Sequence, residues 1–134
     1  MIRNEIKIYD IGIYDNYSQL SFSASNSQYC GTAEIYCPRI DFAKFAEELQ
    51  IFPNSLSHTV TLEIGEDYKT YDYLLIKAFV EDSVGHSILF FIISNANIGR
   101  AEFKMNLEPA SINEIGRKLA LWISSDDIEF IWNG

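Results

Sequence analysis

One residue pattern occurs twice in this chain, once in each half. The pattern is Leu-x-Phe-x-x-Ser-Asn followed by Gly-x-Ala-Glu; the first copy runs from Leu20 to Glu34 and the second from Leu89 to Glu102. Each copy predicts two short strands joined by a polar turn, because apolar and polar residues alternate around turn-forming residues. An amphipathic segment follows each copy, so the repeat indicates a duplicated ββα unit. Convergence of two hairpin-helix units on similar patterns is the alternative.

Period-two alternation predicts further strands outside the repeat. We expect an opening strand over residues 4–14 with a break near Asp10, and a half-buried strand over residues 59–64. The segment 70–80 has apolar residues on one face, whereas 86–94 is apolar on both faces and therefore belongs in the centre of a sheet. The C-terminal alternation of Ile128, Phe130 and Trp132 predicts a final strand or a packed tail.

Apolar residues spaced three and four apart predict two helices. In the first helix the stripe is Phe42, Phe45, Ala46 and Leu49, and in the second it is Ile112, Ile115, Leu119 and Trp122. Asp41 is the expected N-cap of the first helix, and Ser111 with Glu114 matches a capping box for the second. Gly116 lies inside the second helix, where a glycine permits a close approach to the sheet.

Together these elements give the order β-ββα-ββ-ββα with a short tail. The predicted fold class is α+β, with an antiparallel sheet of about six to seven strands and two helices packed on one face. A chain of 134 residues is long enough for one core, so residues 1–134 are expected to form a single domain.

Composition limits the possible partners. The formal net charge is −9, from 19 acidic and 10 basic residues, and such a field repels nucleic-acid phosphates while favouring a basic protein or a cationic ligand. Solubility alone is the other explanation of the charge. The N-terminus lacks the apolar core of a signal peptide, and the longest apolar run, residues 88–93, is far shorter than a membrane span needs. A cytoplasmic protein that binds neither membrane nor nucleic acid is therefore expected.

The sequence contains few signs of catalysis. No phosphate-binding glycine loop, zinc-protease motif or nucleophile elbow occurs, and the two histidines, His58 and His86, sit beside turns. Cys30 and Cys37 bracket a predicted strand that holds them too far apart for a disulfide. We therefore expect no catalytic residue, no metal ligand, no cofactor and no enzymatic activity.

A broad aromatic face is the first candidate for a partner site. If Leu74, Ile76 and Ala78 face the helices, the alternate residues of that strand point away from them. These outward residues are Tyr71, Tyr73, Leu75, Lys77 and Phe79, joined from neighbouring strands by Tyr36, Phe90 and Ile92, with Glu34, Glu102 and Lys104 nearby. Soluble monomers seldom leave such a face bare, so it is expected to bind a partner or a second copy. Alternatively, the first strand and the C-terminal tail cover it.

Acidic residues near one hairpin turn form the second candidate. Glu63, Glu66, Asp67 and Asp72 lie around this turn, and they would steer a basic partner towards it. Glu34 and Glu102 form a further acidic pair, since they hold matching positions in the repeat; solvated strand residues are the plainer interpretation. The predicted partner-binding residues are Tyr36, Glu66, Asp67, Tyr71, Asp72, Tyr73, Phe79, Glu34 and Glu102.

Several segments carry a resemblance to a known class of proteins. They are the repeated Leu-x-Phe-x-x-Ser-Asn hairpin, residues 41–45 with 52–53, residues 83–87 and residues 108–112. Together they resemble small bacterial proteins that include the immunity proteins encoded beside polymorphic toxins. The resemblance implies a toxin-binding role. With the acidic charge and the missing catalytic motifs, the leading hypothesis is a non-enzymatic inhibitor of a cognate, basic toxin. The alternatives are a small-molecule-binding or weakly enzymatic domain that uses His86 and the paired glutamates between sheet and helices, and a homodimeric structural module.

Overall fold

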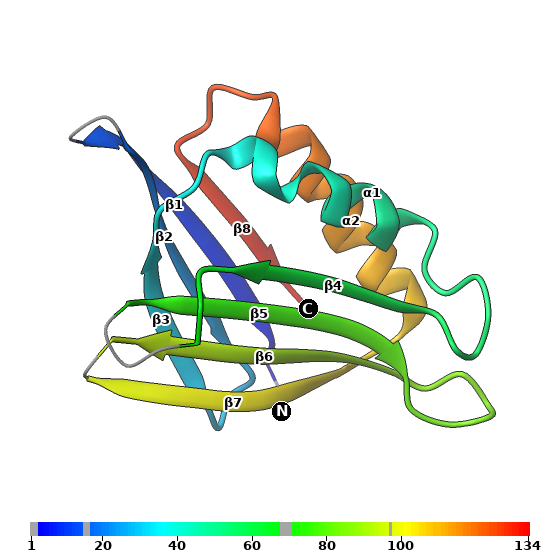
Figure 1. Cartoon of the computed structure of the whole chain (residues 1–134). Coiled ribbons are helices and arrows are strands. Elements are labelled where there is room, and N and C mark those ends of the chain that lie inside the picture. The colour runs from blue at the N-terminus through cyan, green and yellow to red at the C-terminus, as the bar shows by residue number, and fades with distance from the viewer. Residues whose placement is uncertain (1–2, 15–16, 68–70, 97) are drawn as a thin grey trace.

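The computed structural model describes residues 3–14, 17–67, 71–96 and 98–134. In these residues the chain forms eight strands and two α-helices (Figure 1). The first half contains β1 (Glu5–Tyr14), β2 (Tyr17–Ser25), β3 (Cys30–Ile35), a 3-10 turn (Arg39–Phe42), α1 (Ala43–Gln50) and β4 (Thr59–Ile64). The second half contains β5 (Tyr73–Val80), β6 (Ser87–Asn95), β7 (Gly99–Leu107), α2 (Pro109–Ile123) and β8 (Glu129–Asn133). The α+β class and the predicted order of elements are confirmed.

The strands form two antiparallel sheets of four strands each, instead of the predicted single sheet of six to seven strands. Sheet A has the order β3-β2-β1-β8, and sheet B has the order β4-β5-β6-β7. The difference arises because the C-terminal residues 129–133 pair with β1, so that Glu5 lies opposite Asn133. The first hairpin, β2 with β3, therefore lies in a sheet that also contains β1 and β8 but none of the strands β4–β7.

The two halves share one topology, βββαβ, and they exchange their last strands. In each half the first three strands form a meander, and the strand after the helix joins the meander of the other half. Thus β4 pairs with β5, and β8 pairs with β1. Neither sheet is complete without a strand from the other half.

One hydrophobic core lies between the sheets and the helices. Sheet A packs its apolar face against the apolar face of sheet B, and the helix pair lies over the side between β4 and β8 (Figure 1). Phe22 of β2 contacts Phe91 of β6 across this core, and Phe91 in turn stacks on Phe103 at 5.3 Å between centroids. The inward-facing residues predicted by alternation are buried, among them Leu20, Phe22, Ala24, Ala33, Ile35, Leu74, Ile76 and Ala78.

The helices cross where both carry small residues. At Gly116 an added Cβ would lie 2.7 Å from the carbonyl oxygen of Ala46 and 2.7 Å from the Leu49 Cβ. The close approach predicted at Gly116 is therefore real, but its partner is α1 and not the sheet. Asn113 joins the two helices as well, because its side-chain amide donates to the carbonyls of Leu49 at 2.8 Å and Phe52 at 2.7 Å, near the C-terminus of α1.

Both predicted helix caps are wrong. The helix α1 follows directly on the 3-10 turn, so its N-cap is Phe42 and not Asp41, and no side chain caps it. The helix α2 begins at Pro109, before Ser111, with Glu108 as its N-cap. Proline suits the first helical position because its missing amide hydrogen has no partner there. Ser111 and Glu114 therefore lie inside the helix.

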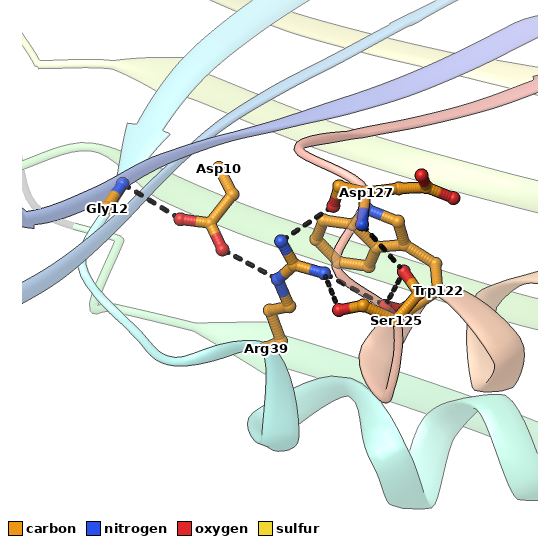
Figure 2. Close-up of polar contacts among 6 residues, drawn as sticks. All are labelled: Asp10, Gly12, Arg39, Trp122, Ser125 and Asp127. Carbon is orange, nitrogen blue, oxygen red and sulfur yellow. Dashed lines mark hydrogen bonds and ion pairs between the residues drawn. The ribbon is translucent and has the colours of Figure 1, made fainter.

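Arg39 links the ends of several elements (Figure 2). Its Nε donates to Asp10 Oδ2 at 2.6 Å, and its Nη atoms donate to the carbonyls of Trp122 at 2.9 Å, Ser125 at 3.1 Å and Asp127 at 2.7 Å. The guanidinium also lies 4.3 Å from the centroid of the Trp122 ring. Asp10 accepts a further bond from the Gly12 amide within the β1 bulge, where a break in the strand was predicted. Arg39 thus fixes β1 to the C-terminal end of α2.

Candidate functional site

The structure divides the nine predicted partner-binding residues into three groups. Four of them line one small pocket: Tyr36, Glu66, Tyr71 and Asp72. Phe79 and Glu102 line a larger groove on sheet B. The other three, Glu34, Asp67 and Tyr73, make hydrogen bonds or ion pairs inside the protein. Glu34 and Tyr36 come from β3 and the segment after it, so they do not lie on the sheet-B face where the sequence placed them.

The first group forms what we call the tyrosine pocket, with a volume of about 290 Å³. Its walls are Tyr36, Glu66, Tyr71 and Asp72, and its other lining residues are Ile35, Ile64 and Gly65. The two tyrosines remain accessible, with 63% of Tyr36 and 67% of Tyr71 exposed. The pocket therefore combines two accessible aromatic rings with two carboxylates over an apolar base.

The tyrosine pocket is assembled from both sheets. Tyr36 follows β3 of sheet A, whereas Glu66 and Asp72 lie between β4 and β5 of sheet B. The two sides are joined because the backbone amide of Glu34 donates to Asp72 Oδ2 at 2.7 Å. Gly65 turns the chain beside the pocket with φ at +84°, and an added Cβ there would lie 2.8 Å from the Asp72 carbonyl oxygen. A side chain at Gly65 would therefore disturb the pocket wall.

Three of the predicted residues, Tyr73, Asp67 and Glu102, make hydrogen bonds or ion pairs near the pocket. Tyr73 is only 4% exposed, and its hydroxyl donates to Glu63 Oε2 at 2.5 Å. Burial, followed by this hydrogen bond to Glu63, raises the pKa of Tyr73 well above its usual range. Arg100 pairs with Asp67 and also donates to Glu102 Oε2 at 3.2 Å. Tyr73 is thus not accessible to a partner, and Asp67 is partly neutralised by Arg100.

The outward face predicted for residues 71–80 exists on sheet B. Leu75, Lys77 and Phe79 point away from the core, as the half-buried positions in β5 alternate with the fully buried Leu74, Ile76 and Ala78. Phe90 and Ile92 of β6 join them through direct cross-strand pairing. The first strand and the C-terminal tail do not cover this outer face. Both β1 and β8 belong to sheet A, which packs against the inner face of sheet B.

An open groove of about 1070 Å³ lies over part of this outer face. Its lining includes Lys77, Phe79, Phe90, Lys104 and Asn106 from the sheet, with Leu56, Ser57, His58, Asn26 and Tyr29 around it. The sequence predicted the outward direction of these strand residues. It did not predict the surrounding residues 26, 29 and 56–58, because they precede β4 or lie in the turn between β2 and β3.

The residues suggested for a small-molecule or enzymatic site do not lie together. Glu34 belongs to sheet A and Glu102 to sheet B, while His86 lies in the loop between β5 and β6 with 70% of its side chain exposed. His86 Nδ1 lies 2.5 Å from Asp82 Oδ2, and this hydrogen bond raises the pKa of His86. The region between the sheets and the helices, where that site was expected, is occupied by core side chains.

Within the described ranges, no group of three or more histidine, cysteine, aspartate or glutamate residues is arranged to hold a metal ion. The two cysteines are both free thiols, Cys30 exposed and Cys37 buried. No helix in the described part of the chain is long and apolar enough to cross a membrane.

Comparisons with family models, with curated proteins and with solved structures found no match to this chain.

Proposed function

We propose that this chain is a protein-binding module of the immunity type, which inhibits a basic partner by receiving one of its lysine or arginine side chains in the tyrosine pocket. The observation that supports this proposal is the convergence of Tyr36, Glu66, Tyr71 and Asp72 around one pocket. Tyr36 follows β3 and the other three residues lie in the β4–β5 connection, and together they provide aromatic faces and negative charge at the same place.

The chemistry of the tyrosine pocket suits a cation with an apolar stem. A lysine or arginine head group over a tyrosine ring gains about 0.5–2 kcal/mol, and its methylene stem packs on apolar walls such as Ile35 and Ile64. Glu66 is exposed and supplies the opposite charge. Small-molecule sites usually enclose about 300–1,000 Å³. At about 290 Å³ the tyrosine pocket lies at the lower end of this range, and it is large enough for one lysine or arginine side chain.

The net charge of the protein supports association with a basic partner. A formal charge of −9 raises the rate of encounter with a cationic surface and makes that rate sensitive to salt. Added salt should therefore slow association more than it speeds dissociation.

Co-expression of the tagged chain with the product of the adjacent gene, followed by pull-down and calorimetry, tests the proposal. We expect Tyr36→Ala and Tyr71→Ala each to weaken binding by about tenfold or more, which corresponds to about 1.4 kcal/mol. Tyr17→Ala is the matched control, because Tyr17 is also a 65% exposed tyrosine but lies on β2, outside the tyrosine pocket. A partner that binds both pocket variants as tightly as the unchanged protein would refute the role of the pocket, and no binding at all would refute the inhibitor proposal.

A further inference from the structure

The two sheets have the same topology but very different outer faces. On sheet A the outward residues of the paired central strands are polar or charged, as in the pairs Lys7 with Ser23 and Tyr9 with Ser21. On sheet B the corresponding pairs include Leu75 with Ile92, both half-buried, and Phe79 with Ile88, of which Ile88 is fully buried. Sheet A carries isolated apolar residues on this face, Tyr9 and the edge-strand residue Ile131, but its paired central strands fold without apolar pairs there, so the architecture does not require them. The outer face of sheet B therefore carries apolar residues for another reason.

The groove on sheet B places a phenyl ring between two lysines. Lys77 of β5 lies opposite Phe90 of β6, and Phe90 lies opposite Lys104 of β7. Residues directly opposite one another in antiparallel strands have Cβ atoms about 4.5–5.5 Å apart, so these three side chains are immediate neighbours. Phe79 lies two residues along β5 from Lys77, on the same face. The floor of the groove is thus aromatic with positive charge on both sides.

Residues from two connections border the floor. Leu56, Ser57 and His58 precede β4 at one edge of the sheet, and Asn26 and Tyr29 lie beside β7 at the other edge. Asn26 is held there because its side-chain amide donates to the Lys104 carbonyl at 2.8 Å. Because both edges of the groove are occupied, it suits a compact molecule better than an extended peptide that crosses the sheet.

The charges around the groove are unequally satisfied. The Lys104 ammonium lies 3.6 Å from a carboxylate oxygen of Glu81, and Glu102 receives a hydrogen bond from Arg100. Among the residues that the structure describes, no carboxylate lies within 4.0 Å of the Lys77 ammonium. In a chain with 19 acidic residues and 10 basic ones, a half-buried lysine beside two phenylalanines is suited to an anion from outside.

We propose that this groove binds a flat organic anion, with an aromatic ring on Phe79 and Phe90 and an acidic group at Lys77. Ligand sites of this kind are mostly apolar, with a few polar groups that fix orientation. The volume of about 1070 Å³ admits a ligand of several rings. The site is separate from the tyrosine pocket, with which it shares no lining residue, so either proposal can fail without the other.

Three probes with the same ring system test the proposal on the unchanged protein: naphthalene-2-carboxylate, naphthalene-2-methanol and naphthalene-2-methylammonium. We expect the carboxylate to bind at least tenfold more tightly than the neutral alcohol, and the ammonium to bind most weakly. In amide NMR spectra of the labelled full chain, the carboxylate should shift signals from β5, β6 and β7 next to the groove. Equal affinities for the three probes, no binding at millimolar concentration, or shifts confined to other surfaces would each overturn the proposal.

Two variants then separate charge from aromatic contact. Lys77→Met keeps an unbranched apolar stem without the charge, and it should remove the preference for the carboxylate while the alcohol still binds. Phe90→Ser introduces the residue type that β2 carries on the outer face of sheet A, and it should weaken all three probes. Lys7→Met on that polar face is the matched control and should change nothing. An unchanged carboxylate preference in Lys77→Met would contradict the proposed site. So would a dimer in sedimentation that Phe90→Ser converts to a monomer, because a second copy would then cover the groove.

Discussion

The rings of Phe22 and Phe91 lie with their centroids 6.3 Å apart across the core, and the two residues hold the same place in the two copies of the repeated sequence pattern. Each belongs to the second strand of its half, and the two halves contribute their hairpins to different sheets. The apolar residues of the repeat, such as Leu20, Phe22 and Leu89, therefore supply the contact between the sheets, and packing alone explains them.

Gly116→Ala should destabilise the protein even though alanine favours helices. The change gains about 1 kcal/mol of helix propensity, but the added Cβ would lie 2.7 Å from the Ala46 carbonyl oxygen, and overpacking of this kind costs about 1–3 kcal/mol. We expect a net loss of about 1 kcal/mol in the free energy of unfolding, measured by urea denaturation. Gly99→Ala is the control, because no atom lies within 4 Å of its added Cβ. Stabilisation by Gly116→Ala would mean that the helices cross less closely.

Arg39→Lys should lower the free energy of unfolding by about 2–3 kcal/mol, since a lysine cannot reproduce the planar set of donors that serves Asp10 and three carbonyls. The side chains of Arg39 and Asp10 are only 17% and 22% exposed, so the lost bonds are poorly replaced by water. Arg117→Lys on the exposed face of α2 should stay within about 0.5 kcal/mol of the unchanged protein. Equal losses from the two variants would show that the Arg39 contacts carry little energy.

The two thiols should differ sharply in reactivity. Burial, with a smaller contribution from the charge of Asp41, raises the pKa of Cys37 to about 12, so almost none of it is thiolate near pH 8. Cys30 is exposed. Iodoacetamide should therefore label only Cys30 on the folded protein and both cysteines after denaturation. The folded Cys30→Ser variant should not be labelled. Rapid labelling of Cys37 under native conditions would show that its part of the core opens readily.

His86 should titrate above the usual histidine range. A hydrogen bond from its ring to the Asp82 carboxylate, and then the charge of Asp82, raise the pKa of His86, and the same hydrogen bond lowers the pKa of Asp82. Because the pKa of His86 is higher in the folded than in the unfolded protein, the protonated ring stabilises the fold. This stabilisation is complete at a pH below the pKa of the unfolded state, and it is lost as the pH rises through the pKa of the folded state. An NMR titration of the His86 ring should show the raised pKa, and Asp82→Asn should reduce it. An identical titration in both proteins would contradict the hydrogen bond in solution.

Local patterns predicted the elements well, because alternation and helical spacing record which face of each element is buried. Phe42, Phe45, Ala46 and Leu49 are all buried, as their spacing indicated. The helix starts were mispredicted, since Asp41 and Ser111 are good capping residues whose sites were taken by a 3-10 turn and by Pro109. Capping preference is a small energy, and the surrounding chain geometry outweighed it.

Sheet membership could not be predicted from alternation. The alternation of apolar residues predicts that Phe130 and Trp132 point inwards. It does not predict that they pair with Ile8 and Ile6, near the other end of the sequence. For the same reason the sequence placed Tyr36 and Glu34 on the wrong sheet. It nevertheless named four residues of the tyrosine pocket, two tyrosines from the predicted aromatic face and two carboxylates from the acidic turn, but it did not predict that these two groups meet.

The exchange of β4 and β8 has a consequence for biosynthesis. While the chain emerges from the ribosome, β1 can pair with β2, but its other edge stays open until residues Glu129–Asn133 have emerged as well. Loop closure across nearly the whole chain is slow, and an unpaired edge in the meantime is a point of aggregation. The first sheet can therefore close only after residues 129–133 have left the ribosome, and a nascent chain that stalls within α2 would leave that edge of the sheet exposed.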